Sequence, residues 1–306
     1  MKIHHGLEGV TRTRPLVLAI GFFDGFHLGH QAIVRATLRL RRPGFSAGVL
    51  TFSNHPAAFL RPGSEPPLIT TLQERMNLIA RAGIDEAFVL NFDAAIAKLA
   101  PQEFIDRILL GTLHVRGLVV GENFRFGHKR AGDAAFARTA LALHGISFEA
   151  LPNERALDAR VSSTRIREAL AAADMTTVNT LLGESYALRG CVVLGEGRGH
   201  DFGVPTANLK IPNGKTLPKD GVYAATARHD GREYAALVSI GTKPTFAGRE
   251  RAVEVWMRDF QRTIYGEEVA LRELRFLRDQ VAFESIDALL EQMRRDMDAV
   301  KFPTLA

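Results

Sequence analysis

The chain has 306 residues, of which 46% are hydrophobic and 24% are charged, and this balance is typical of a globular protein with room for two ordinary domains. No run approaches the roughly 20 consecutive apolar residues of a membrane span, and residues 1–15 lack the apolar segment of a secretory signal. We therefore expect a cytoplasmic protein without a membrane partner. Lys and Arg number 39 against 34 Asp and Glu, a modest surplus compatible with acidic small molecules or nucleic acid. Because no dense basic run occurs, we expect no nucleic-acid partner, and the single Cys191 excludes an intramolecular disulfide.

The first part of the chain alternates short apolar runs with helical patterns. The runs "PLVLAIG", "AGVLTF", "EAFVLNF", "RGLVVG" and "ISFEAL" precede helices expected over about 28–40, 71–83, 101–109, 133–145 and 162–173. Pro101 suits a first helical turn, Asp133 suits an N-cap, and Gly145 suits the end of a helix. Five successive strand-then-helix units predict an α/β domain with a doubly wound parallel sheet.

After about Gly183 the chain reads as strands and turns. Strands are expected in "LRGCVVLG", "AVEVWMRDF" and "VALRELRFL", and in a hairpin that turns at Asp230 and Gly231. A final helix behind the N-cap candidate Ser285 carries an apolar stripe of core type: Ile286, Leu289, Leu290, Met293, Met297 and Val300. These patterns predict two domains, 1–183 and 184–306, the second being a small antiparallel β domain closed by a helix.

Four polar loops are expected at the carboxyl edge of the parallel sheet, where such folds bind ligands. The first is "GFFDGFHLGH", in which Gly25 and Gly29 allow a close backbone approach and a helix beginning near Leu28 directs its N–H groups at an anion. His27 and His30 lie three residues apart around that helix start and could donate to phosphate oxygens. A single histidine there would more often be structural, but the pair favours a phosphate site.

The loops "TFSNHP" and "GENFRFGHKRAGD" follow the second and fourth strands, and "SSTRIR" opens the helix after the fifth. Ser163 or Thr164 could cap that helix, with Arg165 and Arg167 beside a second anion site, although the segment alone reads equally as a plain capped helix. Neither the P-loop pattern nor G-x-G-x-x-G occurs in these loops. The sequence therefore favours a nucleotide site built with histidines in place of a P-loop lysine.

A second candidate site begins in "GEGRGHDFGVPTANL". Its glycines suit close packing around phosphates, although such a loop could also be a plain connection. Thr206 and Asn208 lie two apart and so face the same way on an extended chain, presenting neutral oxygens of the kind that Mg²⁺ prefers. In "AVEVWMRDF", Glu254 alternates with core-type valines and is either an exposed carboxylate or a general base.

These motifs carry a family resemblance. "HLGH" with "SSTRIR" resembles the nucleotidyltransferase superfamily. The ordered set that continues through "GEGRGHDFGVPTANL", "DGVYAA", "SIGTKPTF" and "VEVWMRDF" is similar to the bacterial bifunctional riboflavin kinase/FAD synthetases, from about Leu16 to the C-terminal helix. The resemblance implies that the first domain transfers AMP from ATP to FMN. It implies that the second is a β-barrel that phosphorylates riboflavin with ATP.

For the first domain, the resemblance implies that His27 and His30 are catalytic and hold the ATP phosphates, and that Ser163, Thr164 and Arg167 neutralise the pyrophosphate. The expected ATP-binding set is Gly21, Phe23, Asp24, Gly25, His27, Gly29, His30, Ser163, Thr164 and Arg167. The expected flavin-binding set is Asn54, His55, Asn123 and Phe124. Asp24 either orients a histidine or caps the loop, and we favour the cap. Phe124 and Phe126 either border the flavin or form a small core of their own.

For the second domain, the resemblance implies that Glu254 is the base for the riboflavin 5′-hydroxyl and that Thr206 and Asn208 bind Mg²⁺. The expected ATP- and flavin-binding set is Gly195, Gly197, Arg198, Gly199, Gly203, Pro205, Tyr223 and Glu254. Phe22 stands where the family often has Asn. Trp256 stands where the family often has His, on the flavin side of the kinase site, and its indole could stack there.

The expected ligands are ATP as co-substrate, Mg²⁺ as cofactor, and riboflavin, FMN and FAD as substrates or products, on a monomer or transient homo-oligomer. Two other interpretations stay open at this point. One half of the chain could have lost its activity, although the presence of Thr206, Asn208 and Glu254 argues against loss of the kinase. The chain could instead be a nucleotide-sensing or RNA-binding regulator, which would bind without turnover.

Overall fold

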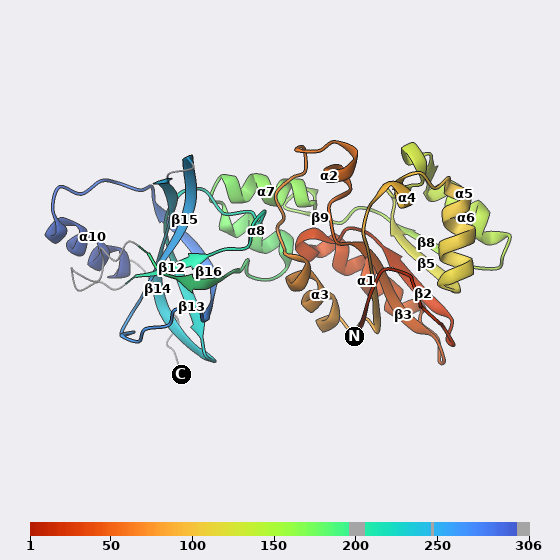
Figure 1. Ribbon diagram of the computed structural model, residues 1–306, viewed down its shortest axis with the longest axis horizontal. Helices are drawn as coiled ribbons and strands as arrows, with labels where there is room; N and C mark the ends of the chain where they lie inside the picture. Colours follow the sequence, from red (N-terminus) through yellow and green to blue (C-terminus); the bar gives the residue numbers. More distant parts are fainter. Residues whose placement is uncertain (196–205, 246–247, 299–306) are drawn as a thin grey trace. The chain divides into compact units, whose positions relative to one another are not determined.

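A computed structural model describes residues 1–195, 206–245 and 248–298 (Figure 1). Contacts between residues divide the chain into two compact units, Met1–Ser163 and Thr164–Ala306. This division falls before the expected boundary at Gly183, because helices α7 (Ser163–Ala171) and α8 (Met175–Leu182) contact the second unit: α8 contacts strand β16, and the carbonyl of Leu170 accepts a hydrogen bond from the Lys219 amide at 2.9 Å. Each unit is described by itself below.

The first unit contains a six-stranded parallel sheet with the strand order β1-β4-β3-β2-β5-β8. Its strands are β1 (Lys2–His5), β2 (Leu16–Ile20), β3 (Ser46–Phe52), β4 (Glu86–Leu90), β5 (Val115–Gly121) and β8 (Ser147–Leu151). The expected doubly wound sheet is confirmed, with its order reversing between β2 and β5. Sequence reasoning missed β1, because its residues "KIHH" are polar and lack an apolar run; it pairs with β4 at the edge of the sheet.

Helices and short elements surround this sheet (Figure 1). The helical segments are η1 (Asp24–Phe26), α1 (Leu28–Leu40), α2 (Pro56–Leu60), α3 (Leu72–Arg81), α4 (Ala94–Ala97), α5 (Pro101–Glu103), η2 (Phe104–Thr112), η3 (His128–Arg130) and α6 (Ala134–Ala142). Two small antiparallel pairs are β6 (Arg125–Phe126) with β7 (Gly132–Asp133), and β9 (Arg155–Ala156) with β10 (Ala159–Arg160).

Burial on both faces of the sheet explains the continuous apolar runs of its strands. Every residue of β2 is buried; Leu16, Leu18 and Ile20 belong to one hydrophobic cluster and Ala19 to a second. Because both faces are covered, the polar chemistry of this unit is left to the loops at the strand ends.

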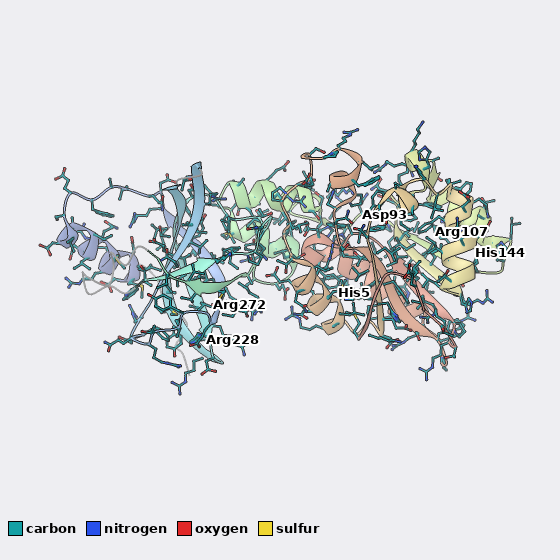
Figure 2. All side chains as sticks on the ribbon, viewed as in Figure 1. His5, Asp93, Arg107, His144, Arg228 and Arg272 are labelled. Atoms are coloured by element: carbon teal, nitrogen blue, oxygen red, sulfur yellow. The ribbon has the colours of Figure 1, made fainter. Side chains whose placement is uncertain are left out.

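Local signals account for most of the helix ends. Thr71 and Glu74 form a capping box at the start of α3, Asp133 caps α6, and Pro101 occupies the first turn of α5. Asp93, labelled in Figure 2, caps α4 by accepting from Ala95 and Ile96 at 2.9 and 3.1 Å. The caps expected at Asp133 and Pro101 are confirmed.

Two expected helix ends differ from the sequence interpretation. Gly145 does have the positive φ of a terminating glycine, but the C-cap of α6 is Leu143, two residues earlier. The helix expected over 101–109 is a short α-helix that continues as the π-helix η2 to Thr112, where the Leu113 amide bonds to the carbonyl of Ile108.

The second unit contains a closed antiparallel barrel with the strand order β11-β12-β15-β14-β13-β16. Its strands are β11 (Leu188–Val193), β12 (Ala207–Lys210), β13 (Gly221–His229), β14 (Arg232–Thr245), β15 (Gly248–Met257) and β16 (Glu268–Arg278). Asp230 and Gly231 both have positive φ and join β13 to β14, as the hairpin signal predicted. Alternation along β15 buries Val253 and Val255 inside the barrel.

Helix α10 (Ile286–Asp298) covers part of the outer barrel surface. Ser285 accepts from the Ala288 amide at 3.2 Å, which confirms the expected N-cap. Met293 and Met297 pack against the cluster of Ala235, Leu237, Trp256 and Leu277. Ile286, at the start of the stripe, is 40% exposed, and Val300 lies outside the described residues. Core packing is thus confirmed for the C-terminal half of the stripe only.

A buried ion pair anchors α10 to the barrel. Asp296 accepts from Arg278 on β16 at 2.8 Å to Nη2 and 3.1 Å to Nε, and from Gln292 at 2.9 Å. Because Asp296 is only 6% exposed, removing one partner would leave the other charge buried without compensation.

We expect Asp296→Ala to loosen α10 and to lower the free energy of unfolding by about 3 kcal/mol. Trp256, the only tryptophan, reports on this directly, because its emission should shift to the red as α10 leaves it. Urea unfolding followed by this fluorescence measures both effects, and Asp296→Asn repeats the test with the shape preserved. Glu291→Ala, which removes a surface pair with Arg295 on the same helix, should change neither. Unchanged Trp256 emission in both Asp296 variants would contradict the anchor.

Candidate active sites

The loop after β2 lies where the strand order of the parallel sheet reverses. Phe23 has a positive φ of 58° and is completely buried, so its ring forms the floor of the loop. A Cβ at Gly21 would lie 3.1 Å from that ring, and Gly25, with a φ of 79°, packs against Ile69. The glycines of the loop are therefore explained by close packing within the protein. Phe23 supports the loop from below with a buried ring, and its assignment as an ATP contact stays a prediction.

His27 and His30 lie side by side above that floor. Their ring centroids are 3.6 Å apart with 17° between the planes, and the His30 ring meets Phe23 edge-on at 5.3 Å. His27 is the N-cap of α1, its Nδ1 accepting from the His30 amide at 3.4 Å. A Cβ at Gly29 would lie 3.2 Å from the His27 ring, so the intervening glycine permits the stack. The pairing expected from the three-residue spacing is confirmed.

Both imidazoles are neutral at pH 7. Burial lowers the pKa of His27 to about 4, against the opposing effect of the Asp24 charge. Burial, together with His27 and Arg75, holds the pKa of His30 well below its usual range. The buried Nδ1 of His30 has no hydrogen-bond partner in the described part of the chain. The pair is therefore a preorganised set of neutral ring groups.

Asp24 caps the loop. Its carboxylate accepts from the Ile69 amide at 3.1 Å and from the Thr70 amide and hydroxyl at 2.9 and 3.1 Å. With 2% of its surface exposed, it ties the histidine loop to the segment before α3. This agrees with the loop-capping interpretation, since its acceptor oxygens bond to the segment before α3; the place of Asp24 in the ATP-binding set stays a prediction.

Arg75 on α3 is the residue that sequence reasoning missed. It is 1% exposed, and its guanidinium donates to the carbonyls of Phe22 at 2.5 Å and Phe52 at 2.7 Å. Its charged carbon lies 4.4 Å from the Phe22 ring centroid. Burial lowers the pKa of Arg75 to about 10, and the Asp24 charge raises it, so the group stays protonated at pH 7. The available signal was a charged residue among Leu72, Met76 and Ile79 on the buried face of a helix.

Helix α7 begins at Ser163, whose hydroxyl donates to the carbonyl of Asp24 at 2.9 Å. Ser163 therefore bonds to the histidine loop and does not cap its own helix, which corrects the expectation that Ser163 or Thr164 is the N-cap. Thr164 is exposed and Arg167 partly buried in the first turns of the helix. The bond from Ser163 joins the "SSTRIR" segment to the loop of His27.

The predicted flavin-side residues have structural partners. The Asn54 amide exchanges two hydrogen bonds with the backbone of Phe92, at 2.7 and 3.0 Å, and so clamps the loop after β3 to the loop after β4. His55 caps α2 through the Ala57 amide at 3.1 Å and meets the Phe22 ring edge-on at 4.7 Å. These two bonds position the loop, and the partly buried Asn54 stays a predicted flavin contact.

Asn123 and Phe124 lie in the loop after β5. Asn123 is exposed and donates to the Asn153 side chain at 3.0 Å. Phe124 stacks on Phe126 with centroids 5.1 Å apart, and both pack against the hydrophobic cluster of the first unit. Phe126 is 8% exposed and so belongs to a small core, as one interpretation predicted. Phe124 is only partly buried, so part of its ring remains open.

In the barrel, Glu254 lies between two polar neighbours on adjacent strands. The register pairs it with Asn208 on β12 and with Ser239 on β14, so the three side chains share the outer face of the sheet. Gln280 donates to the Ser239 hydroxyl at 2.8 Å. A Cβ at Gly195 would collide with the Asn208 amide, so this glycine makes room for it. Asn208, Glu254 and Ser239 are therefore direct neighbours on this face, and each carries a side-chain oxygen.

Two further residues of the barrel have well-defined surroundings. Tyr223 is completely buried and donates to the carbonyl of Lys219 at 2.6 Å, and burial raises its pKa to about 12. Its ring belongs to the barrel core, and its part in ligand binding stays a prediction. Trp256 packs against the cluster of Ala235, Leu237 and Met297, and its expected stacking on the flavin side stays a prediction. The predicted residues Gly197, Arg198, Gly199, Gly203 and Pro205 lie outside the described residues.

Comparisons with known proteins match each unit to a different family. The FAD synthetase family matches residues 10–165, and the riboflavin kinase family matches residues 182–302. A curated bifunctional riboflavin kinase/FMN adenylyltransferase from Listeria monocytogenes is 34% identical over 284 residues, covering 92% of this chain and 90% of its own length. The protein of the same name from Haemophilus influenzae is 33% identical, with 98% of each chain covered.

A solved structure shares the whole fold. It is titled "Crystal Structure of Macrolide-efflux Protein from Streptococcus pneumoniae" and superposes with a TM-score of 0.91 at 29% identity. The superposition covers 99% of this chain and 100% of that one. The arrangement of a parallel α/β domain followed by a closed barrel is therefore common to both proteins.

None of the described helices in this chain is both long and apolar enough to cross a membrane.

Two phosphate-handling domains in one chain define a bifunctional transferase: a nucleotidyltransferase-type sheet with a neutral histidine pair, and a barrel that sets a carboxylate beside oxygen donors. The two family matches occur in the same order as these domains. The chain belongs to the bifunctional riboflavin kinase/FMN adenylyltransferase family.

The depressed pKa of His27 predicts an acid-sensitive first domain. An unfolded histidine titrates near pH 6.5, whereas folded His27 gains its proton only near pH 4, so within this window the unfolded chain binds more protons. The contribution of neutral His27 to the free energy of unfolding is fully present above pH 6.5 and is lost as the pH falls toward 4.

His27→Asn keeps an N-cap side chain and removes the titration. We expect its unfolding temperature to fall less steeply than that of the unchanged protein between pH 6.5 and 4. His144→Asn, at an exposed histidine labelled in Figure 2, is the matched control and should follow the unchanged protein. Equal slopes for His27→Asn and the unchanged protein would contradict the assignment.

Proposed function

We propose that the first domain transfers AMP from ATP to FMN, giving FAD and pyrophosphate, and that the barrel phosphorylates riboflavin to FMN, with the residues assigned below. The observation that carries the first assignment is the stacked, neutral pair of His27 and His30 at the start of α1. The second rests on the cross-strand register of Glu254 with Asn208.

In the first reaction, an oxygen of the FMN phosphate attacks the α-phosphorus of ATP, and the bond from that phosphorus to the pyrophosphate oxygen breaks. The FMN phosphate is itself the nucleophile, so the protein needs no covalent group and acts through positioning and charge stabilisation. His30 donates from its ring to a phosphate oxygen, using the nitrogen side that has no protein partner. The N-terminal end of α1 contributes its positive dipole to the same oxygens.

The pyrophosphate leaving group carries most of the developing charge. Thr164 and Arg167, in the first turns of α7, are proposed to bind it through a hydroxyl and a guanidinium. Ser163 helps by bonding the start of α7 to the carbonyl of Asp24. On the flavin side, Asn123 and the open face of Phe124 are proposed to contact FMN, while His55 bounds the site and Asn54 holds its loop.

In the second reaction, Glu254 accepts the proton of the riboflavin 5′-hydroxyl while that oxygen attacks the γ-phosphorus of ATP, and ADP leaves. The donor set around Glu254 consists of oxygens, which fits a hard divalent cation. Thr206 and Asn208 are proposed to hold Mg²⁺ together with ATP. When bound, the ion supplies positive charge to the phosphate oxygens.

The domain limits 1–183 and 184–306 remain part of this proposal, as do cytoplasmic residence and a monomer or transient homo-oligomer without nucleic acid. The family matches end at 165 and resume at 182, and a limit at 183 keeps Thr164 and Arg167 with the histidine loop. Incubation with riboflavin, ATP and Mg²⁺, followed by separation of the flavins, tests the whole assignment: both FMN and FAD are expected, and the absence of both would overturn it.

The two activities should separate by substitution. We expect His30→Ala to abolish FAD formation, a loss of at least about a hundredfold, and to leave FMN formation intact. Glu254→Gln should lower FMN formation about a hundred- to ten-thousandfold and leave FAD formation from supplied FMN intact. Flavin separation after single-substrate reactions measures both. Loss of both activities in either folded variant would contradict one site per domain.

Asn208 provides a separate test of the metal assignment. Asn208→Ala should raise the Mg²⁺ concentration needed for half-maximal FMN formation about tenfold or more, because one oxygen ligand is removed. Asn213→Ala, at an exposed loop position in the same unit, is the matched control. An unchanged Mg²⁺ requirement in Asn208→Ala, with the rate lowered at every concentration, would remove Asn208 from the metal site.

A further inference from the structure

A pocket of about 700 Å³ opens at the amino edge of the parallel sheet. Its walls come from the segment before β2, the segment between α1 and β3, and the beginnings of β1 and β4. Its volume lies within the range of small-molecule sites. The side chains that matter here are Lys2, Arg12, Arg14, Arg41, Arg42 and Phe45.

This pocket is distinct from the site of the histidine pair. The histidine loop follows the carboxyl end of β2, whereas Thr11 to Arg14 precede its amino end. The five residues of β2 separate the two by roughly 16 Å at about 3.3 Å per residue. A molecule in this pocket therefore does not touch the reacting atoms of the proposed adenylyl transfer.

The two carboxylates of the pocket are already neutralised by partners. Asp85 accepts from Arg41 at 3.0 and 3.2 Å. Glu86 accepts from Arg12 at 2.8 Å and contacts His4 at 3.1 Å. Arg41 and Arg12 thus balance the negative charges of Asp85 and Glu86. The other positive charges on the pocket wall are left uncompensated.

That excess charge comes from Lys2, Arg14 and Arg42. Their side chains have no ion-pair or hydrogen-bond partner within residues 1–195, 206–245 and 248–298. They approach from different segments: β1, the strand entry at β2, and the residues after α1. Three cations from three segments around one cavity fit a ligand with more than one negative charge.

Arg12 contributes a buried side chain to the pocket wall. Only 3% of its side chain is exposed, and its guanidinium lies 5.6 Å from the Phe88 ring centroid. Its Nη2 donates to the carbonyl of Arg14 at 3.2 Å, which fixes the backbone of the "TRTRP" segment. The buried Nε has no acceptor among the described residues. An arginine held this way is preorganised, so little side-chain entropy is lost when a ligand binds.

We propose that this pocket binds a small phosphate-bearing anion at a site separate from that of the histidine pair. Arg14, Arg42 and Lys2 pair with its phosphate oxygens, and the buried Arg12 supports them. Phe45 and Pro43 add an apolar wall, so bare polyphosphate and a nucleotide share the recognised phosphate chemistry and differ in their use of that wall.

The test is hydrogen exchange of the full chain, read peptide by peptide, with inorganic pyrophosphate, ADP and a short oligouridylate added in turn. Peptide resolution matters because pyrophosphate is also a product of the proposed first reaction. We expect pyrophosphate or ADP to slow exchange over residues 11–15 and 41–46 in addition to any effect over 21–31. Stronger protection by ADP identifies a nucleotide, and equal protection identifies the phosphate group alone.

Matched variants complete the experiment. Arg14→Ala with Arg42→Ala should raise the concentration needed for half-protection of residues 11–15 and 41–46 about tenfold or more, because charge-assisted hydrogen bonds are lost. Arg107→Ala with Arg262→Ala removes the same charge from exposed residues that do not line the pocket and should have no effect; Arg107 is labelled in Figure 2. Protection confined to residues 21–31, equal affinity in both double variants, or protection by oligouridylate only would each overturn the proposal.

Discussion

Arg75 inserts its guanidinium beneath the histidine loop, and the geometry of the first site depends on that buried charge. It joins the carbonyl of Phe22, in the loop after β2, to that of Phe52 at the end of β3. Asp24, with the opposite charge, does the same for backbone N–H groups: its carboxylate accepts hydrogen bonds from the amides of Ile69 and Thr70. Since both groups are almost fully buried, their hydrogen bonds hold the loop in one conformation and so fix the positions of its histidines.

The same buried environment determines the chemistry of the histidine pair. Withdrawal from water and the nearby Arg75 keep His30 neutral, so the loop offers ring nitrogens without a fixed positive charge. Helix α7 begins at Ser163, which bonds to the loop, and it carries Arg167 within its first turns. The barrel works differently, because Glu254 stays partly exposed on the outer face among hydroxyl and amide oxygens.

Repeated local patterns made most of the fold predictable. The apolar runs of β2 to β5 and the caps at Asp133 and Ser285 depend on residues close in sequence, so they could be interpreted one segment at a time. The polar strand β1 could not be found this way, since only pairing with β4 makes it a strand. The surroundings of Tyr223 and Trp256 could not be predicted for a related reason: alternation along a strand shows that faces differ, but closure of the barrel and the docking of α10 decide what covers each face.

The sequence by itself determined the class of both domains and the close approach of His27 and His30, because both depend on residues near one another in the chain. Only the tertiary structure decided which polar residues support the loops and which are left open to a ligand. Arg75, Asn54 and Asp24 form hydrogen bonds with backbone groups that are distant in the chain. Such partners are fixed by packing of the whole sheet, and no local pattern specifies them.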